Sequence, residues 1–226
     1  MSAEIHEMKK FRDESHVFND REDAGKMLAM MLQPEYPLAN GLMVLAVPSG
    51  GVPVGLVVSR TLDLPFDLLI ARKLKIPDNP EAGFGAMAQD GTTFLNERLL
   101  ARLSLSEARI EEEKKRVGRE LKKRNALFRH DRPFPVVAGK KVILVDDGLA
   151  SGFTMLACID MVKKAGAVKI IVAVPTAPQR TIDQISTEAD KIYCLNIRTT
   201  QFFAVAEAYR HWYDLDEQEV TDMLEA

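Results

Sequence analysis

Short apolar runs alternate with helical patterns along most of the chain. Five runs have the length and the nearly unbroken apolar character of strands that are buried on both faces. Helical patterns separate them, the first of which starts after Asn19 or Asp20 and stops before Pro34. Because strands that alternate with helices form parallel sheets, the order predicts an α/β fold. We expect a five-stranded parallel core sheet with helices on both faces, built from residues 42–47, 65–71, 140–145, 168–175 and 190–195.

Three segments fall outside this alternation. Residues 104–128 predict a long charged helix whose apolar stripe is too narrow for full burial, so we expect it on the outside or against a partner chain. Residues 76–97 are rich in Gly and Pro, and "QDGT" predicts a hairpin turn at Asp90–Gly91. In the tail, Asp216 and Glu219 fit a capping box at a helix start.

Composition narrows the class of protein. A chain of 226 residues with 46 % hydrophobic residues can bury a sizeable core, and we expect a single domain over residues 1–226 with its core at about 20–195. A net charge of −3 argues against a dedicated nucleic-acid binder. Cys158 and Cys194 do not make a disulfide framework. With no signal-peptide pattern and no membrane-spanning apolar run, we expect a cytoplasmic protein.

Unusual loops follow three of the predicted strands. Ligands of parallel sheets bind beyond the carboxyl ends of the strands, where residues 48–53, 72–85 and 146–154 would lie. Asp146 and Asp147 end the third strand, and two carboxylates can accept the two O–H groups of a vicinal diol. The small and hydroxyl residues that follow lead into a helix start, which favours a phosphate dianion. Together these features indicate a ribose 5-phosphate.

Alternatives exist for each loop. The acid pair could be a Walker-B strand or a metal-binding pair, but the chain contains no G-x-x-x-x-G-K-[ST] motif. "PSGG" at 48–51 lets backbone N–H groups approach an anion, or is an ordinary strand-to-helix turn. Arg72 and Lys73 suit a polyanion, or form a solvated basic turn.

"VILVDDGLASGFTM" (142–155) resembles the phosphoribosyl-diphosphate (PRPP) motif of type I phosphoribosyltransferases, most closely those of uncharacterised acceptor. The resemblance implies a hood over the site, which we expect from residues 196–226 with the N-terminus, and Mg²⁺ carried with PRPP rather than held in a protein cage. It also implies a strained or cis peptide bond near Ser49, where relatives often carry a basic residue. The implied roles are catalysis for Asp146 and Asp147, which hold the ribose hydroxyls; 5-phosphate binding for Gly148, Leu149, Ala150, Ser151, Gly152, Phe153 and Thr154; and pyrophosphate binding for Ser49, Gly50, Gly51, Arg72 and Lys73.

The acceptor is less well marked. Ala150 stands where 6-oxopurine transferases carry a carboxylate, which disfavours that mechanism, and residues 76–97 lack the basic residues of orotate-type enzymes. Phe202 and Phe203 could stack on a flat base, or could plug the core. Lys114, Lys115 or Arg116 could reach over the site from the long helix, although a solvated or subunit-facing helix is the plainer interpretation.

These features predict transfer of the 5-phosphoribosyl group from PRPP to a nitrogen acceptor, possibly a nucleobase, with release of pyrophosphate. One alternative is a PRPP-binding regulator without transferase activity, which would bind polynucleotide with steep salt dependence. Another is a hydrolase or phosphorylase that acts on a ribose phosphate bond. The expected partners are PRPP and the acceptor, without membrane or nucleic acid, and the resemblance implies a homodimer.

Overall fold

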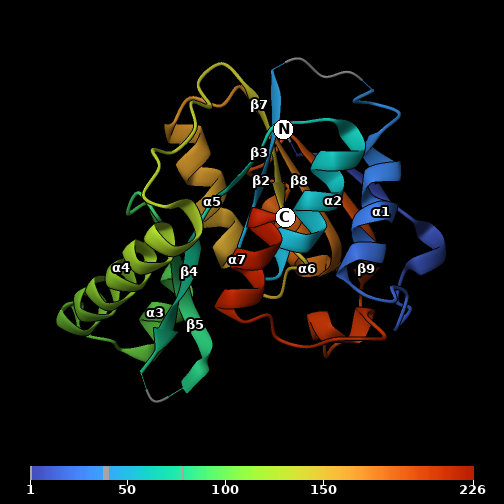
Figure 1. The fold of residues 1–226 in the computed structure, drawn as a ribbon. Coiled ribbons are helices and arrows are strands. Elements are labelled where there is room, and N and C mark those ends of the chain that lie inside the picture. The colour runs from blue at the N-terminus through green and yellow to red at the C-terminus, as the bar shows by residue number, and fades with distance from the viewer. Residues whose placement is uncertain (1, 38–40, 78) are drawn as a thin grey trace.

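A parallel six-stranded sheet forms the centre of the computed structural model, which describes residues 2–37, 41–77 and 79–226 (Figure 1). The five predicted strands are present, which confirms the α/β fold, and a sixth lies at the edge. All neighbouring pairs are parallel. The order is β1 (Glu4–Glu7), β9 (Lys191–Arg198), β8 (Lys169–Pro178), β7 (Lys141–Val145), β2 (Leu42–Ala46) and β3 (Phe66–Leu68).

Helices cover both faces of this sheet. On one face lie α1 (Arg21–Leu32) and α2 (Gly51–Leu62), and on the other lie α5 (Phe153–Lys164) and α6 (Gln179–Ile185). Alternate residues of β7 serve the two layers, since Val142 and Leu144 pack with α5 while Ile143 and Val145 pack with α1 and α2. Burial on both faces explains why the central strands read as continuous apolar runs.

A second sheet of three antiparallel strands stands beside the first. It contains β4 (Ala71–Ile76), β5 (Asn79–Ala88) and β6 (Thr93–Leu95). The hairpin turn predicted at Asp90–Gly91 is confirmed, with Gly91 at φ 90° and the Asp90 carboxylate accepting from the backbone N–H of Thr92 at 2.8 Å. This sheet contacts α5 on one side and α4 on the other.

The long charged helix predicted over residues 104–128 is α4 (Glu107–Arg129), and it packs within its own chain. A separate short helix, α3 (Glu97–Leu103), precedes it and ends at Ser104. Val117, Leu121 and Phe128 of α4 are buried against Leu74 of β4 and Phe84 of β5. Arg129, 1 % exposed, forks onto the carboxylate of Asp67 in β3 with distances of 2.8 and 2.9 Å. The expected narrow stripe is therefore covered without a partner chain.

Two boundaries differ from the sequence predictions. The sequence predicts no strand before residue 42, but Glu4–Glu7 forms β1, an edge strand with a single apolar residue and therefore no apolar run. The predicted strand 65–71 stops at Leu68, and the chain then crosses to the second sheet at Ala71. Leu69 and Ile70 between them are fully buried, so the apolar run hides the crossing.

The segments that leave β1 and β9 meet at the carboxyl edge of the sheet. They include the short helices η1 (Lys9–Phe11) and η2 (Val205–Ala208), and Phe18 donates its backbone N–H to the carbonyl of Ala208 at 3.0 Å. The tail ends in α7 (Glu217–Glu225), whose predicted capping box between Asp216 and Glu219 is confirmed. Helix α7 packs on α4 and α2 (Figure 1). In the described part of the chain, no helix is both long enough and apolar enough to cross a bilayer.

Candidate functional site

The acid pair lies where β7 ends. Asp147 is 9 % exposed, and its Oδ2 accepts a hydrogen bond from Nε of Arg21 at 2.8 Å. The hydroxyl of Tyr209 donates to the backbone carbonyl of Asp147 at 2.6 Å. Asp146 is half-buried, and its Oδ1 accepts the backbone N–H of Asp147 at 2.9 Å. The two residues therefore differ: Asp147 is paired with the Arg21 guanidinium, and Asp146 is the more exposed of the two.

Arg21 ties the acid pair to the tail. It is the first residue of α1, and its Nη1 donates to the carbonyl of Tyr213 at 2.9 Å. Its guanidinium lies 3.9 Å from the ring centroid of Trp212, a cation–π distance. Sequence reasoning missed this residue, because its partner Asp147 is 126 positions away along the chain.

The loop after β2 presses against the acid pair. Its Pro48–Ser49 peptide bond is cis, which confirms the prediction for this position. A Cβ added to Gly50 would lie 1.8 Å from Oδ2 of Asp147. A Cβ on Gly51 would lie 2.7 Å from the backbone carbonyl that ends β7. The two predicted loops therefore meet, and only glycines allow that contact.

The first half of the loop after β7 is held by β8 and by the tail of the chain. The backbone N–H of Leu149 donates to the carbonyl of Thr176 in β8 at 2.9 Å. A Cβ on Gly148 would lie 2.5 Å from Val205 and 2.9 Å from Thr176. Gly148 therefore lies closely between β8 and the tail segment that carries Val205, and a larger residue would clash with both.

The second half of the same loop forms an exposed tip. Ala150 and Ser151 are exposed, and the carbonyl of Ala150 accepts from the hydroxyl of Thr181 at 2.6 Å. Gly152 has φ 77° and is followed directly by α5, which contains Thr154 in its first turn. The backbone N–H groups at the start of this twelve-residue helix are a favourable place for an anion.

Arg72 and Lys73 do not end a strand of the main sheet. They lie inside β4, where successive side chains point to opposite faces. Nε of Arg72 lies 3.7 Å from Oε2 of Glu120 on α4. Lys73 is exposed, and its stem lies across Gly83 of β5, where a Cβ would be 2.3 Å from Cγ of Lys73. The predicted pair of cations is therefore split between two faces.

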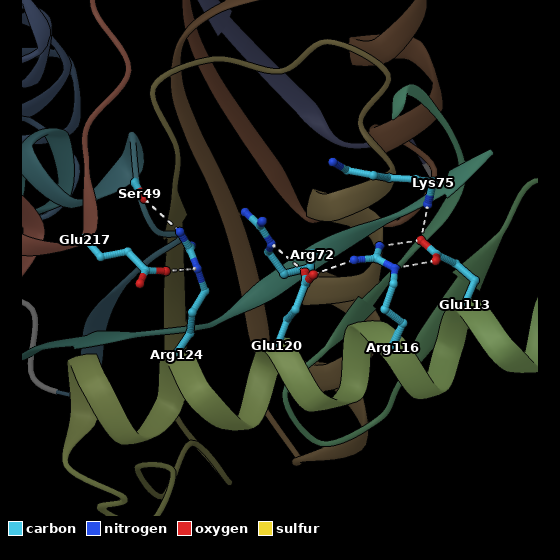
Figure 2. A network of polar contacts seen from close by, with 8 residues as sticks. All are labelled: Ser49, Arg72, Lys75, Glu113, Arg116, Glu120, Arg124 and Glu217. Carbon is cyan, nitrogen blue, oxygen red and sulfur yellow. Dashed lines mark hydrogen bonds and ion pairs between the residues drawn. The ribbon is translucent and has the colours of Figure 1, made fainter. Parts of the chain in front are cut away.

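A cation absent from the prediction reaches the loop after β2. Arg124 of α4 donates from Nη2 to Oγ of Ser49 at 3.3 Å and from Nε to Oε1 of Glu217 at 3.1 Å (Figure 2). Among the basic residues of α4 that the sequence singled out, Arg116 is held by Glu113 at 2.6 Å and Lys114 by Glu111 at 2.7 Å. With Lys and Arg so common on this helix, nothing in the pattern marked Arg124.

The two candidate aromatics lie after β9. Phe202 is 80 % exposed and Phe203 is half-buried. They precede η2, whose Val205 lies against Gly148. Because the Phe202 side chain is exposed, the alternative that it plugs the core is wrong.

Burial and mutual repulsion act on the carboxyl groups. Burial, and then the charge of Asp147, raise the pKa of Asp146 well above its ordinary value. Burial also raises the pKa of Asp147, against the opposing effect of the Arg21 guanidinium. Folding therefore disfavours the ionised form of Asp146, so the ionised carboxylate lowers the free energy of unfolding.

This cost in stability predicts a pH-dependent effect of Asp146→Asn. A group whose pKa is raised by folding stabilises the protein when protonated, and that contribution is lost as pH rises from about 4 through the raised pKa. We expect the variant to match wild type near pH 4 and to be the more stable protein at pH 8. Urea unfolding midpoints at a series of pH values measure this. A variant that is less stable than wild type at pH 8 would contradict it.

Comparisons with known proteins support a family. A family model for the phosphoribosyl transferase domain matches residues 35–212. The chain belongs to this phosphoribosyl transferase family. Its curated relatives include "Putative phosphoribosyl transferase Rv0571c" of Mycobacterium tuberculosis (strain ATCC 25618 / H37Rv), which is 35 % identical over 209 residues, or 92 % of this chain and 46 % of that protein. This family member therefore spans about half the length of the curated relatives it matches.

Solved structures agree with the fold. The structure of TT1426 from Thermus thermophilus is 32 % identical, has a TM-score of 0.74, and is matched over 92 % of this chain and 97 % of that chain. A hypoxanthine phosphoribosyltransferase from Staphylococcus aureus is 11 % identical, with a TM-score of 0.51 and coverage of 90 % and 88 %. The second likeness shows only that this phosphoribosyl transferase domain shares the fold.

Proposed function

We propose that this phosphoribosyl transferase moves the 5-phosphoribosyl group from PRPP to a nitrogen acceptor and releases pyrophosphate. The observation that carries the proposal is the contact between the two loops, because Gly50 lies against the Asp147 carboxylate. A ribose at the acid pair would then have its C1 side toward the Ser49–Gly51 loop and its 5-phosphate toward residues 148–154. The 5-phosphate, the ribose and the pyrophosphate of one PRPP molecule would then contact the loop after β7, the acid pair and the loop after β2, respectively.

Each group in this site has a role in the proposed reaction. The bond from C1 to the pyrophosphate oxygen breaks as a bond from C1 to the acceptor nitrogen forms, and C1 gains positive charge between them. The Asp146 carboxylate would accept a ribose O–H and stabilise that charge as it develops, which lowers the barrier. A carboxylate oxygen has two lone pairs, so Asp147 can also accept a hydroxyl while paired with Arg21. The backbone N–H groups at the start of α5 would bind the 5-phosphate.

Magnesium would arrive with PRPP. Oxygen ligands suit this ion, and the half-buried Asp146 carboxylate presents such a ligand at the site. In the described ranges, no group of three or more His, Cys, Asp or Glu side chains is arranged to hold a metal. We propose that substrate oxygens and water would supply most of its ligands, and that the ion would neutralise charge on the leaving pyrophosphate.

We assign the acceptor side to the hood. In this proposal residues 196–226 form most of it, and Phe202 and Phe203 provide a face on which a planar base could stack. Phe202 is exposed at 80 % and lies three residues before Val205, which touches the phosphate loop. This placement favours a flat ring as acceptor over a small amine.

Pyrophosphate release from PRPP tests the proposal. Wild type, Asp146→Asn and the control Asp63→Asn would be assayed with Mg²⁺ and a panel of purine bases, pyrimidine bases and ammonia. Asp63 is an exposed left-handed cap at the end of α2, a conformation that Asn tolerates. We expect release with one acceptor class, kept by Asp63→Asn and reduced at least about hundredfold in Asp146→Asn.

Other outcomes of this assay identify the alternatives. Release with water or inorganic phosphate alone would replace the transferase by a hydrolase or phosphorylase. PRPP binding without release under any condition would favour a regulator, and salt-sensitive binding of polynucleotide would support that. Either result would overturn the proposed transfer.

A further inference from the structure

Arg124 is a buried cation with spare hydrogen-bonding capacity beside the loop after β2. Its side chain is 11 % exposed, and two of its nitrogens donate to Ser49 and Glu217. Its third guanidinium nitrogen, Nη1, is buried and has no hydrogen-bond partner within the described residues. Buried donors are nearly always satisfied in native proteins, and exceptions often mark a ligand site. The unmet donor therefore suggests an anion that completes the site.

The surroundings of Arg124 also favour an anion. Residues 48–51 carry no charge of their own. Burial lowers the pKa of Arg124, and the nearby charge of Arg72 lowers it further. Two guanidiniums thus lie near the loop, and Glu120 and Glu217 are the carboxylates that face them (Figure 2).

Glu217 already places one carboxylate on the Arg124 guanidinium, at Nε rather than at Nη1, so an anion bound there would compete with it. Its carboxylate accepts from Nε of Arg124 at 3.1 Å, yet its side chain is 55 % exposed. A carboxylate and a phosphate offer the guanidinium the same kind of acceptor oxygens. Because Asp216 and Glu219 cap α7, Glu217 can leave Arg124 without unwinding the helix start. Arg124 is fixed by burial, and Glu217 is the partner that can move.

We propose that Arg124 binds the pyrophosphate group of PRPP from α4, and that Glu217 is an exchangeable counterion that competes with it. This inference rests on the proposed function. It gives α7 a regulatory part, because any contact that holds Glu217 on Arg124 lowers the affinity for pyrophosphate. Ribose 5-phosphate, which lacks that group, would bind without displacing Glu217.

Calorimetric titrations with pyrophosphate and with ribose 5-phosphate, each with Mg²⁺, test the inference. Arg124→Met should weaken pyrophosphate binding about tenfold or more and leave ribose 5-phosphate within about twofold. Glu217→Gln should tighten pyrophosphate binding by roughly two- to fivefold, again without effect on ribose 5-phosphate. Two exposed residues provide matched controls, Arg119→Met on α4 and Glu225→Gln on α7, which should leave both ligands unchanged.

The possible failures are distinguishable. If Arg124→Met does not fold, Arg124→Lys keeps the positive charge but loses the planar guanidinium that lies over Phe128, and should weaken only pyrophosphate. Unchanged pyrophosphate binding, or equal losses for both ligands, would overturn the role of Arg124. Weaker pyrophosphate binding in Glu217→Gln would show that Glu217 orients Arg124 rather than competing. A wild type that binds neither ligand would instead refute the proposed function itself.

Discussion

Gly50→Ala should abolish PRPP binding. The new Cβ would lie 1.8 Å from Oδ2 of Asp147, so the carboxylate or the loop has to move. Asp147 cannot yield easily, because it is buried and held by Arg21 at 2.8 Å. Misplacing reacting groups by about 1 Å can cost about a hundredfold in rate, and we expect a loss of at least that size in the affinity for PRPP. Overpacking should also destabilise the fold by about 1–3 kcal/mol.

Gly118→Ala is the matched control for this variant. Gly118 lies within α4, where the nearest contact of an added Cβ is Cε of Met87 at 3.6 Å. Ala is the better helix former, so this change should stabilise the protein by about 0.5–1 kcal/mol and leave PRPP binding intact. Calorimetry and urea unfolding of both variants measure the two effects. Wild-type affinity in Gly50→Ala would mean that the two loops do not form one site.

Arg21→Met should be strongly destabilising. The change leaves the buried Asp147 carboxylate without its cation and removes the hydrogen bond to the Tyr213 carbonyl. Breaking a buried pair by removing one partner costs about 3–5 kcal/mol. For a chain of this size that corresponds to a fall in melting temperature of roughly 6–20 °C. The hood should loosen as well, since Trp212 stacks on the same guanidinium.

Two comparisons isolate the cause. Arg21→Met/Asp147→Asn should recover part of the loss, because no unpaired charge stays buried. The loss in Arg21→Met should also shrink as pH falls, since an unpaired buried acid has a raised pKa and is tolerated when protonated. Arg60→Met, which removes an exposed cation from α2, should change stability by about 0.5 kcal/mol or less. A similar small change in Arg21→Met would contradict the structural role of the pair.

Local patterns were sufficient for the central architecture. Strands β2, β7, β8 and β9 are buried on both faces, so each has an apolar run that stands out from its neighbours. The loops after β2 and β7 each carry their candidate binding residues within a few positions, so the sequence alone suggested the family. The domain match over residues 35–212 confirms that resemblance. The cis bond at Pro48–Ser49 follows from the same short motif.

Long-range pairing was beyond the reach of those patterns. Strand β1 is mostly polar, and its place in the sheet depends on its pairing with β9, which is more than 180 positions away along the chain. Arg21 and Arg124 act at the site through partners 126 and 75 positions away. Charged side chains are common on helices, and only the folded chain shows which of them face a buried carboxylate or a loop. The homodimer and the cytoplasmic location stay predictions.

Calorimetric titration of PRPP with Mg²⁺ into wild type and Asp146→Asn tests the central claim most directly. Asp146 is the better choice of the two aspartates, because Asp147→Asn would also break the pair with Arg21. We predict that wild type binds at micromolar strength, and that Asp146→Asn is folded and stable at pH 8 yet binds at least about tenfold more weakly. Equal binding by the two proteins, or no binding by wild type, would show that the acid pair does not hold the ribose of PRPP.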